Sequence, residues 1–192
     1  MWINVFFVID PSNLTLLTNT NEDVYGIWRT KAGENSQSAT SDKRKGNSPP
    51  RESPKYAFDR KVHTKYLNFG SGSRDSISTT AGISTGFYIT PKRGPSLLKA
   101  VQFYAANDYG NRDPWTMTIE GTNHTSALTK GSSWTLIYDG ITGLNSSTPR
   151  LSKGAMIRLH SNAIWYSSYR LLITSKRGDS NSVQYSEVEF FI

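Results

Sequence analysis

The sequence predicts an all-β fold, a β-sandwich of the jelly-roll type. Short stretches rich in aromatic and β-branched residues recur along the chain, and turn-forming residues such as Gly, Pro, Asn and Asp separate most of them. No stretch of about ten residues has the period of an amphipathic helix. The chain has 192 residues, enough for one domain with a substantial core. We therefore expect a single domain over residues 1–192.

Composition divides the chain into an N-terminal part, a polar segment and a long strand-rich part. Residues 1–30 contain strand-like stretches at 2–9, 14–17 and 24–28, and are predicted to be N-terminal strands or an arm of the same sandwich. Residues 31–54 lack large apolar side chains and are expected to form a long polar loop or an insertion. The later strand candidates are 66–69, 85–90, 97–105, 115–120, 134–138, 155–160, 168–174 and 184–192.

Aromatic residues are expected to fill the core, since they make up 12% of the chain. Alternation is clearest where Trp115, Met117 and Ile119 are separated by threonines and so share one face of a strand. We predict that this face lies against the core. Trp134, on the 134–138 strand, is predicted to be a core residue as well, because large aromatic side chains dominate cores.

Composition and charge exclude several classes of protein. The chain has no cysteine, so neither a disulfide framework nor a thiolate metal site can form. The formal net charge is +7, from 22 Lys and Arg against 15 Asp and Glu. This excess is scattered and matches no nucleic-acid-binding motif, so no nucleic acid partner is expected. No apolar run approaches the roughly 18 residues of a membrane span, and no span is predicted.

The residue types that carry most catalysis form no catalytic pattern here. His63, His124 and His160 lie far apart and fit no metal-ligand spacing. Asp108 and Asp113 flank a turn, and we interpret Asp108 as a cap of that turn and Asp113 as the start of the next strand. We therefore expect that the protein is not an enzyme.

One loop carries a different kind of chemistry. Asp59 and Thr64 lie five residues apart in front of the 66–69 strand. Their oxygens suit a hard cation such as calcium, which takes six to eight oxygen ligands. The same residues fit a surface loop closed by an Asx turn, in which an Asp side chain accepts a nearby backbone N–H. The residues alone leave both interpretations open.

Four segments, taken in order, carry a resemblance to a known family. The sequence Ala-Phe-Asp-Arg-Lys-Val-His-Thr-Lys-Tyr at 57–66 forms one loop, and 103–123 reads as strand, loop and strand ending in Gly-Thr-Asn. Residues 134–137 form the next strand, and the two closing strands are 166–173 and 184–191. This order resembles the discoidin, or coagulation-factor type C, domains. The resemblance implies a galactose-binding-like jelly roll, similar to family 32 carbohydrate-binding modules.

The resemblance also implies a calcium ion that clamps the 57–66 loop to the last strand. Carried over position by position, its ligands are side-chain oxygens of Asp59, Thr64 and Glu187 and backbone carbonyls of Tyr56, Lys61 and Ser186. Arg60 and Lys61 stand where the family usually has Gly and Asn or Asp. The Lys61 ammonium is therefore a rival to calcium for neutralising Asp59 and Glu187.

A ligand site in the loops at one end of the sandwich is implied too. In such a site aromatic faces stack on sugar rings and polar side chains bind hydroxyl groups. Tyr109 is the strongest candidate, since a loop tip seldom needs an aromatic residue for packing. We expect a non-catalytic extracellular module that binds carbohydrate, a glycoprotein or a glycosylated surface. The candidate ligand-binding residues are Tyr109, Asn111, Arg112, His63, Lys65 and Arg177.

The alternative is a structural subunit of an extracellular fibre, coat or matrix. The apolar stretch at 2–9 would then pair with the sheet edge of a neighbouring copy, so the chain would self-associate. Three N-glycosylation acceptor patterns, at Asn13, Asn123 and Asn145, favour a secreted protein whose targeting segment is not present in this sequence.

Overall fold

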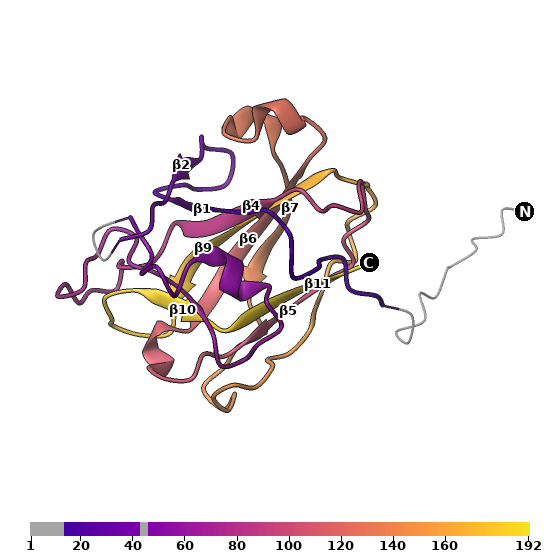
Figure 1. Cartoon of the computed structure of the whole chain (residues 1–192). Coiled ribbons are helices and arrows are strands. Elements are labelled where there is room, and N and C mark those ends of the chain that lie inside the picture. Colours follow the sequence, from indigo (N-terminus) through magenta and orange to yellow (C-terminus); the bar gives the residue numbers. More distant parts are fainter. Residues whose placement is uncertain (1–13, 43–45) are drawn as a thin grey trace, which may run out of the picture.

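The computed structural model describes residues 14–42 and 46–192. These residues form two layers of antiparallel strands with the core between them (Figure 1). The helices among the described residues are all short 3₁₀-helices. None of them has the length and apolar character that crossing a membrane requires. The predicted all-β sandwich is confirmed.

The larger layer is a six-stranded sheet with the order β2-β1-β4-β9-β6-β7. Strand β9 lies between β4 and β6 and is buried over residues 168–173, because strands pair with it on both sides and the second layer covers one face. The members are β1 (Val24–Trp28), β2 (Gln37–Ser38), β4 (Thr85–Ile89), β6 (Pro114–Thr122), β7 (Thr135–Ile141) and β9 (Ser168–Lys176).

The second layer consists of a three-stranded sheet and a separate pair. Strand β5 (Ala100–Tyr104) lies between β11 (Glu187–Phe191) and β8 (Ile157–Arg158), and β3 (Tyr66–Asn68) pairs with β10 (Val183–Tyr185). The short helices lie in the connections and are η2 (Pro54–Ala57), η3 (Gly110–Arg112), η4 (Thr125–Ala127) and η5 (Gly131–Ser133).

Aromatic side chains fill the space between the layers. Phe87 from β4, Tyr169 from β9 and Phe190 from β11 are fully buried. Phe58 of the 57–66 loop packs edge-on against Phe87, with ring centroids 5.0 Å apart, and against Phe190 at 6.0 Å. Aromatic pairs of this geometry contribute about 0.5–1.5 kcal/mol beyond their buried area. The loop is therefore anchored to both layers.

Part of the N-terminal region joins the sandwich. Strand β1 coincides with the strand predicted at 24–28 and pairs with β4. The stretch at 14–17 forms a single bridge rather than a strand: Leu16 lies opposite Phe191, and the Leu17 amide donates to the Phe190 carbonyl at 2.7 Å. The 2–9 stretch, on which the self-assembly alternative depends, lies outside the described residues.

The first part of the polar 31–54 segment folds back onto the large sheet, whereas the Asn47 and Glu52 carbonyls accept the Phe69 and Leu67 amides beside β3. Residues 37–38 form β2 beside β1. The buried Arg170 side chain donates to the Glu34 carbonyl at 2.9 Å and to the Ser36 hydroxyl at 2.8 Å. A segment that its composition marks as a loop is thus held in place by hydrogen bonds to a strand far away in the sequence.

The prediction that Trp115 is a core residue is wrong. Trp115 is 42% exposed, whereas Met117 and Ile119 are fully buried. The pairing of β6 with β9 shifts register on both sides of Thr116, which breaks the alternation that would have placed Trp115 on the same face. Trp134 is 7% exposed, as predicted for a buried residue, and its ring lies 4.9 Å from the Arg170 guanidinium.

The strand predicted at 184–192 is divided in two. Its first part is β10, which pairs with β3, and its second part is β11, which pairs with β5. Ser186 lies between them, fully buried, and its amide donates to the Tyr104 carbonyl at 3.0 Å. Because β11 begins directly after this residue, Glu187 lies beside the 57–66 loop.

Candidate functional site

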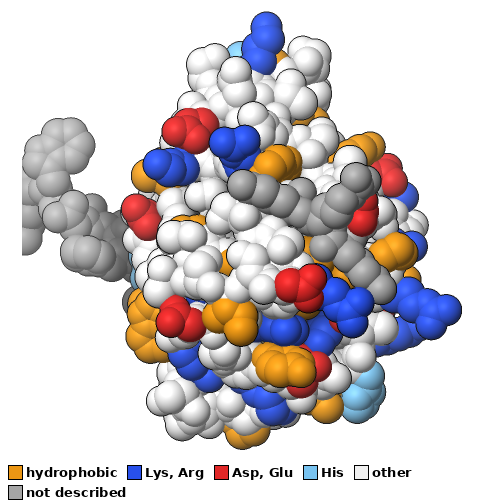
Figure 2. Space-filling view, turned by 90° about the vertical axis from the view of Figure 1, so that its left-hand side faces the viewer, with side chains coloured by type: hydrophobic (Ala, Val, Ile, Leu, Met, Phe, Trp, Pro, Cys, Tyr) orange, Lys and Arg blue, Asp and Glu red, His pale blue; other side chains and the backbone are white. Residues whose placement is uncertain are grey.

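Two adjoining cavities form a groove at the end of the sandwich that carries β10 and η3. The larger has a volume of about 660 Å³ and the smaller about 210 Å³. They share Arg74, Asp75, Arg112 and Asn181, so we treat them as one groove. On the face drawn in Figure 2, Lys and Arg side chains gather in the lower half with Asp and Glu side chains among them.

The sheet topology explains why distant segments meet here. Strand β3 supplies Leu67 to the groove and is held by β10, which follows the 179–181 turn. The register of β6 and β9 pairs Pro114 with Lys176, so the loops before Pro114 and after Lys176 leave the sheet side by side. Ligand sites of this kind are built on loops that a rigid sheet positions.

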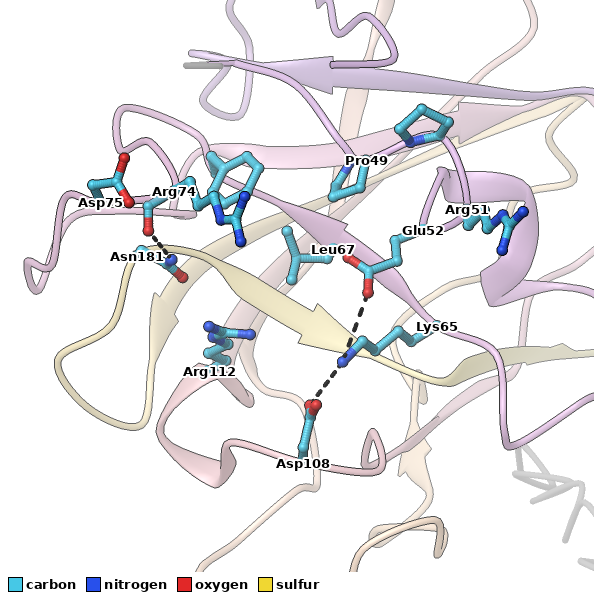
Figure 3. A pocket seen from close by; sticks show the side chains of 12 residues that line it. Pro49, Arg51, Glu52, Lys65, Leu67, Arg74, Asp75, Asp108, Arg112 and Asn181 are labelled. Carbon is cyan, nitrogen blue, oxygen red and sulfur yellow. Dashed lines mark hydrogen bonds and ion pairs between the residues drawn. The ribbon is translucent and has the colours of Figure 1, made fainter. Parts of the chain in front are cut away.

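Lys65 holds together one wall of the groove (Figure 3). Its ammonium lies 2.7 Å from Asp108 Oδ1 and 3.8 Å from Glu52 Oε1. The Gln184 amide also donates to Asp108 Oδ1 at 2.8 Å. Burial raises the pKa of Glu52, although the Lys65 charge opposes the shift. Burial alone would raise the pKa of Asp108, but hydrogen bonds from Lys65 and Gln184 outweigh it and lower that pKa.

Tyr109 and Arg112 form a stacked pair in the loop that also carries Asp108. The Tyr109 side chain is 60% exposed, and its backbone has φ of +40°, a left-handed conformation that costs a non-glycine residue about 1–2 kcal/mol. The Arg112 guanidinium lies 4.0 Å from the ring centroid. It also donates to Ser180 Oγ at 3.1 Å and to Gln184 Oε1 at 3.3 Å. One ring face of Tyr109 is thus covered and oriented by a fixed arginine.

Asp113 lies beneath these loops and links them. Its carboxylate is completely buried and accepts hydrogen bonds from both terminal guanidinium nitrogens of Arg150, with Nη1 at 2.8 Å from Oδ1. Arg177 Nη1 lies 3.1 Å from Asp113 Oδ2. Arg150 Nη1 also donates to the Asp108 carbonyl at 3.2 Å. Charge-assisted bonds of this kind fix geometry, so the three loops are held as one unit.

The structure brings four of the six candidate ligand-binding residues to the groove. Tyr109, Asn111 and Arg112 line the smaller cavity, and Lys65 lines the larger one. His63 and Arg177 line neither cavity. Arg177 is held by Asp113 instead.

Sequence reasoning missed Arg74, Asp75 and Asn181, which line both cavities. Asn181 donates to the Arg74 carbonyl and so ties together two turns that are 107 residues apart. The available signal was weak: charged residues in Ser-rich turns are common on any surface.

Four of the six residues predicted for calcium, Asp59, Lys61, Thr64 and Glu187, meet at a second place, around two carboxyl groups. The Lys61 amide donates to Asp59 Oδ1 at 3.0 Å, which is the Asx turn, and to Glu187 Oε1 at 2.9 Å. The Thr64 hydroxyl lies 2.9 Å from both Asp59 oxygens and 2.7 Å from the Lys61 carbonyl. The loop therefore has both features that the residues left open: it is an Asx turn, and it gathers oxygens.

The Glu187 carboxyl of this pair is buried, and its ionisation is disfavoured. Glu187 is 4% exposed, and burial, together with the adjacent Asp59 carboxyl, raises its pKa to about 8. No ion pair links the exposed Lys61 ammonium to either carboxyl in the part of the chain that the structure describes. Side-chain and carbonyl oxygens without nitrogen or sulfur are the donors that calcium takes, so the residues fit this ion. Tyr56 and Ser186 could contribute carbonyls only.

No family model matches the chain, and no curated protein matches its sequence. Solved structures match its fold. An F5/8 type C domain from Bacteroides fragilis has a TM-score of 0.64 at 9% identity, over 94% of this chain and 97% of that one.

Two carbohydrate-binding modules from Clostridium perfringens match as well. The family 32 module of NanJ, solved with galactose, has a TM-score of 0.59 at 9% identity, over 93% of this chain and 99% of that one. A further family 32 module, solved with GalNAc-β-1,3-galactose, has a TM-score of 0.58 at 11% identity, over 93% of this chain and 100% of that one. At these identities the likeness is one of fold.

Proposed function

This chain has the fold of the discoidin-like, galactose-binding-like modules, and we propose that it is a non-catalytic carbohydrate-binding module whose ligand lies in the groove. The observation that carries the proposal is the exposed ring of Tyr109 next to hydrogen-bonding side chains in a hollow. An exposed aromatic ring beside convergent polar groups is the usual composition of a sugar site.

The geometry suggests how a sugar is held. Arg112 covers one face of the Tyr109 ring, which leaves the other face for the apolar side of a pyranose. Asn181 and Asp75, in the adjoining part of the groove, offer donors and acceptors for hydroxyl groups. The similar modules solved with galactose and with GalNAc-β-1,3-galactose support this class of ligand.

Replacing Tyr109 tests the proposal. We expect the wild-type protein to bind members of a glycan array, and Tyr109→Ala to weaken binding of the best glycan about tenfold in calorimetric titration, because the stacking surface is lost. Tyr25→Ala is the matched control, since Tyr25 is 52% exposed and lines neither cavity of the groove. An array without any bound glycan, or equal affinities of Tyr109→Ala and wild type, would contradict the proposal.

We also propose that a structural calcium ion binds at Asp59, Thr64 and Glu187, completed by carbonyls of the same loop and of Ser186. The support is the pair of adjacent carboxyl groups, Glu187 buried and Asp59 half-buried, with which no side-chain cation forms an ion pair among the described residues. An ion there would tie the 57–66 loop to β11 and add its binding free energy to folding.

We propose an extracellular location because the sequence contains N-glycosylation acceptor patterns. Asn145 is exposed, and its side-chain nitrogen has no hydrogen-bond partner among the described residues, whereas the Asn123 nitrogen donates to the Trp165 carbonyl at 3.0 Å. Asn13 lies outside the described residues. We expect peptide mass spectrometry of the protein from its natural source to find a glycan on Asn145. A peptide with unmodified Asn145 would remove this support.

A further inference from the structure

Two arginines face the groove without an acidic partner. Figure 3 shows the guanidinium groups of Arg74 and Arg112 pointing toward each other from opposite sides of the larger cavity. Within residues 14–42 and 46–192, no ion pair joins either of them to a carboxylate. By contrast, Lys65 in the same groove and Arg150, Arg170 and Arg177 outside it each lie within 4.0 Å of a carboxylate oxygen.

Arg112 is held in place by neutral groups. Its Nε and Nη1 donate to Ser180 Oγ and Gln184 Oε1, and the Tyr109 ring lies against its plane. These contacts fix the orientation of the guanidinium, and none of them comes from a carboxylate. A guanidinium held in this way loses little conformational entropy when it binds a planar or tetrahedral anion.

The acidic residues of the groove do not cancel this charge. Glu52 and Asp108 both pair with Lys65, and although the Arg112 charge also acts to lower the pKa of each carboxyl, neither forms an ion pair with it. Asp75 lies at the edge of the hollow in Figure 3, beyond Arg74, and its side chain is exposed. Lys176 adds positive charge behind the smaller cavity, where its ammonium donates to the Ser180 carbonyl at 2.7 Å. The groove therefore presents an oriented guanidinium, that of Arg112, and an exposed one, that of Arg74, and no carboxylate pairs with either among the described residues.

We propose that the groove selects saccharides that carry an anionic group, a carboxylate or a sulfate, which accepts hydrogen bonds from Arg74 and Arg112 while Tyr109 supports a sugar ring beside it. This inference rests on the proposed function and adds the chemical class of the ligand. A guanidinium can donate two parallel hydrogen bonds to a carboxylate or a sulfate. Hydrogen bonds to charged groups contribute about 1.5–3 kcal/mol each, more than those to sugar hydroxyls.

The test compares three forms of one oligosaccharide: neutral, with a uronic acid in place of a hexose, and sulfated. Calorimetric titration of the wild-type protein is expected to show at least one acidic form binding tenfold or more tightly than the neutral form. Which acidic form binds identifies the anion. Arg74→Gln should reduce this preference about tenfold while retaining the affinity for the neutral form within a few-fold. Arg112→Gln should reduce the preference as well, and it should also weaken binding of the neutral form, because Arg112 orients the Tyr109 ring.

Arg93→Gln is the matched control, since Arg93 is an exposed arginine in the turn after β4 that lines neither cavity, and its loss changes the net charge equally. It should leave the preference unchanged. A neutral form that binds as tightly as both acidic forms would overturn the inference and leave the carbohydrate-binding proposal standing. A preference that Arg93→Gln reduces as much as the groove variants would also overturn it. Binding of none of the three forms, with a blank array, would overturn both proposals.

Discussion

Glu120→Ala is expected to lower the free energy of unfolding by about 3–5 kcal/mol, because it leaves the buried charge of Arg170 without a partner. Arg170 is completely buried and Glu120 is 1% exposed. Their two hydrogen bonds run from Nε to Oε2 at 2.7 Å and from Nη2 to Oε1 at 2.9 Å. Urea denaturation followed by tryptophan fluorescence measures the change.

The effect should extend to the segment that covers the large sheet. Glu120 Oε1 accepts the Gly33 amide at 2.8 Å, and Arg170 donates to Glu34 and Ser36. Losing the carboxylate therefore also releases residues 33–36. We expect their amide hydrogens to exchange faster in Glu120→Ala, while the β5–β11 pairing keeps its protection.

A double variant separates the ion pair from simple packing. Glu120→Leu combined with Arg170→Met removes both charges and keeps similar volume, so it is expected to be more stable than Glu120→Ala. A loss below about 1 kcal/mol in Glu120→Ala would mean that water reaches the guanidinium, since a hydrated charge needs no partner. That outcome would contradict the burial on which the prediction rests.

Without divalent cations, the stability of the protein is expected to fall as the pH rises from about 5 to about 8. The Glu187 pKa lies at about 8 in the folded chain, against 4.5 as the ordinary value. Between these values the folded state holds a proton that the unfolded state has released, so raising the pH favours unfolding. The loss is on the order of 3 kcal/mol once the carboxyl is ionised in both states. Thermal unfolding in chelator across this pH range measures it.

Calcium should reverse this loss. At pH 8 the ion replaces the proton between Asp59 and Glu187, so adding calcium is expected to raise the unfolding temperature of the wild-type protein more at pH 8 than at pH 5. If calcium has no effect at either pH while the loss in chelator remains, the ion proposal fails and the raised Glu187 pKa stands.

Two variants assign the effect to its residue. Glu187→Gln should flatten the pH dependence between pH 5 and pH 8 and remove the response to calcium. Lys61→Gln should change neither, because the Lys61 ammonium is exposed and pairs with no carboxyl among the described residues. A Lys61→Gln variant that loses stability at pH 8 would favour the rival, in which lysine neutralises the two carboxyls.

The sequence by itself determined the features that depend on neighbours along the chain. Residues 24–28 are strand β1 as their aromatic and β-branched composition predicts, and the broad positions of the later strands agree with the structure. The Asx turn at Asp59 joins residues two apart, so local spacing was sufficient to predict it. The exposure of Tyr109 was also predictable from its neighbours along the chain, because it lies in a run of turn-forming residues at a loop tip.

Only the tertiary structure decided which distant residues meet. The Lys61 amide and the Glu187 carboxyl are 126 positions apart, and the break at Ser186 that aligns them follows from two different strand partners. Trp115 lies outside the core because the pairing of β6 with β9 shifts register beside it. Arg74 and Arg112 line the same cavities because turns that are far apart in the sequence lie together at one end of the sandwich. Strand pairing is non-local, so its register, and with it the groove, is set by packing of the whole chain and not by any one segment.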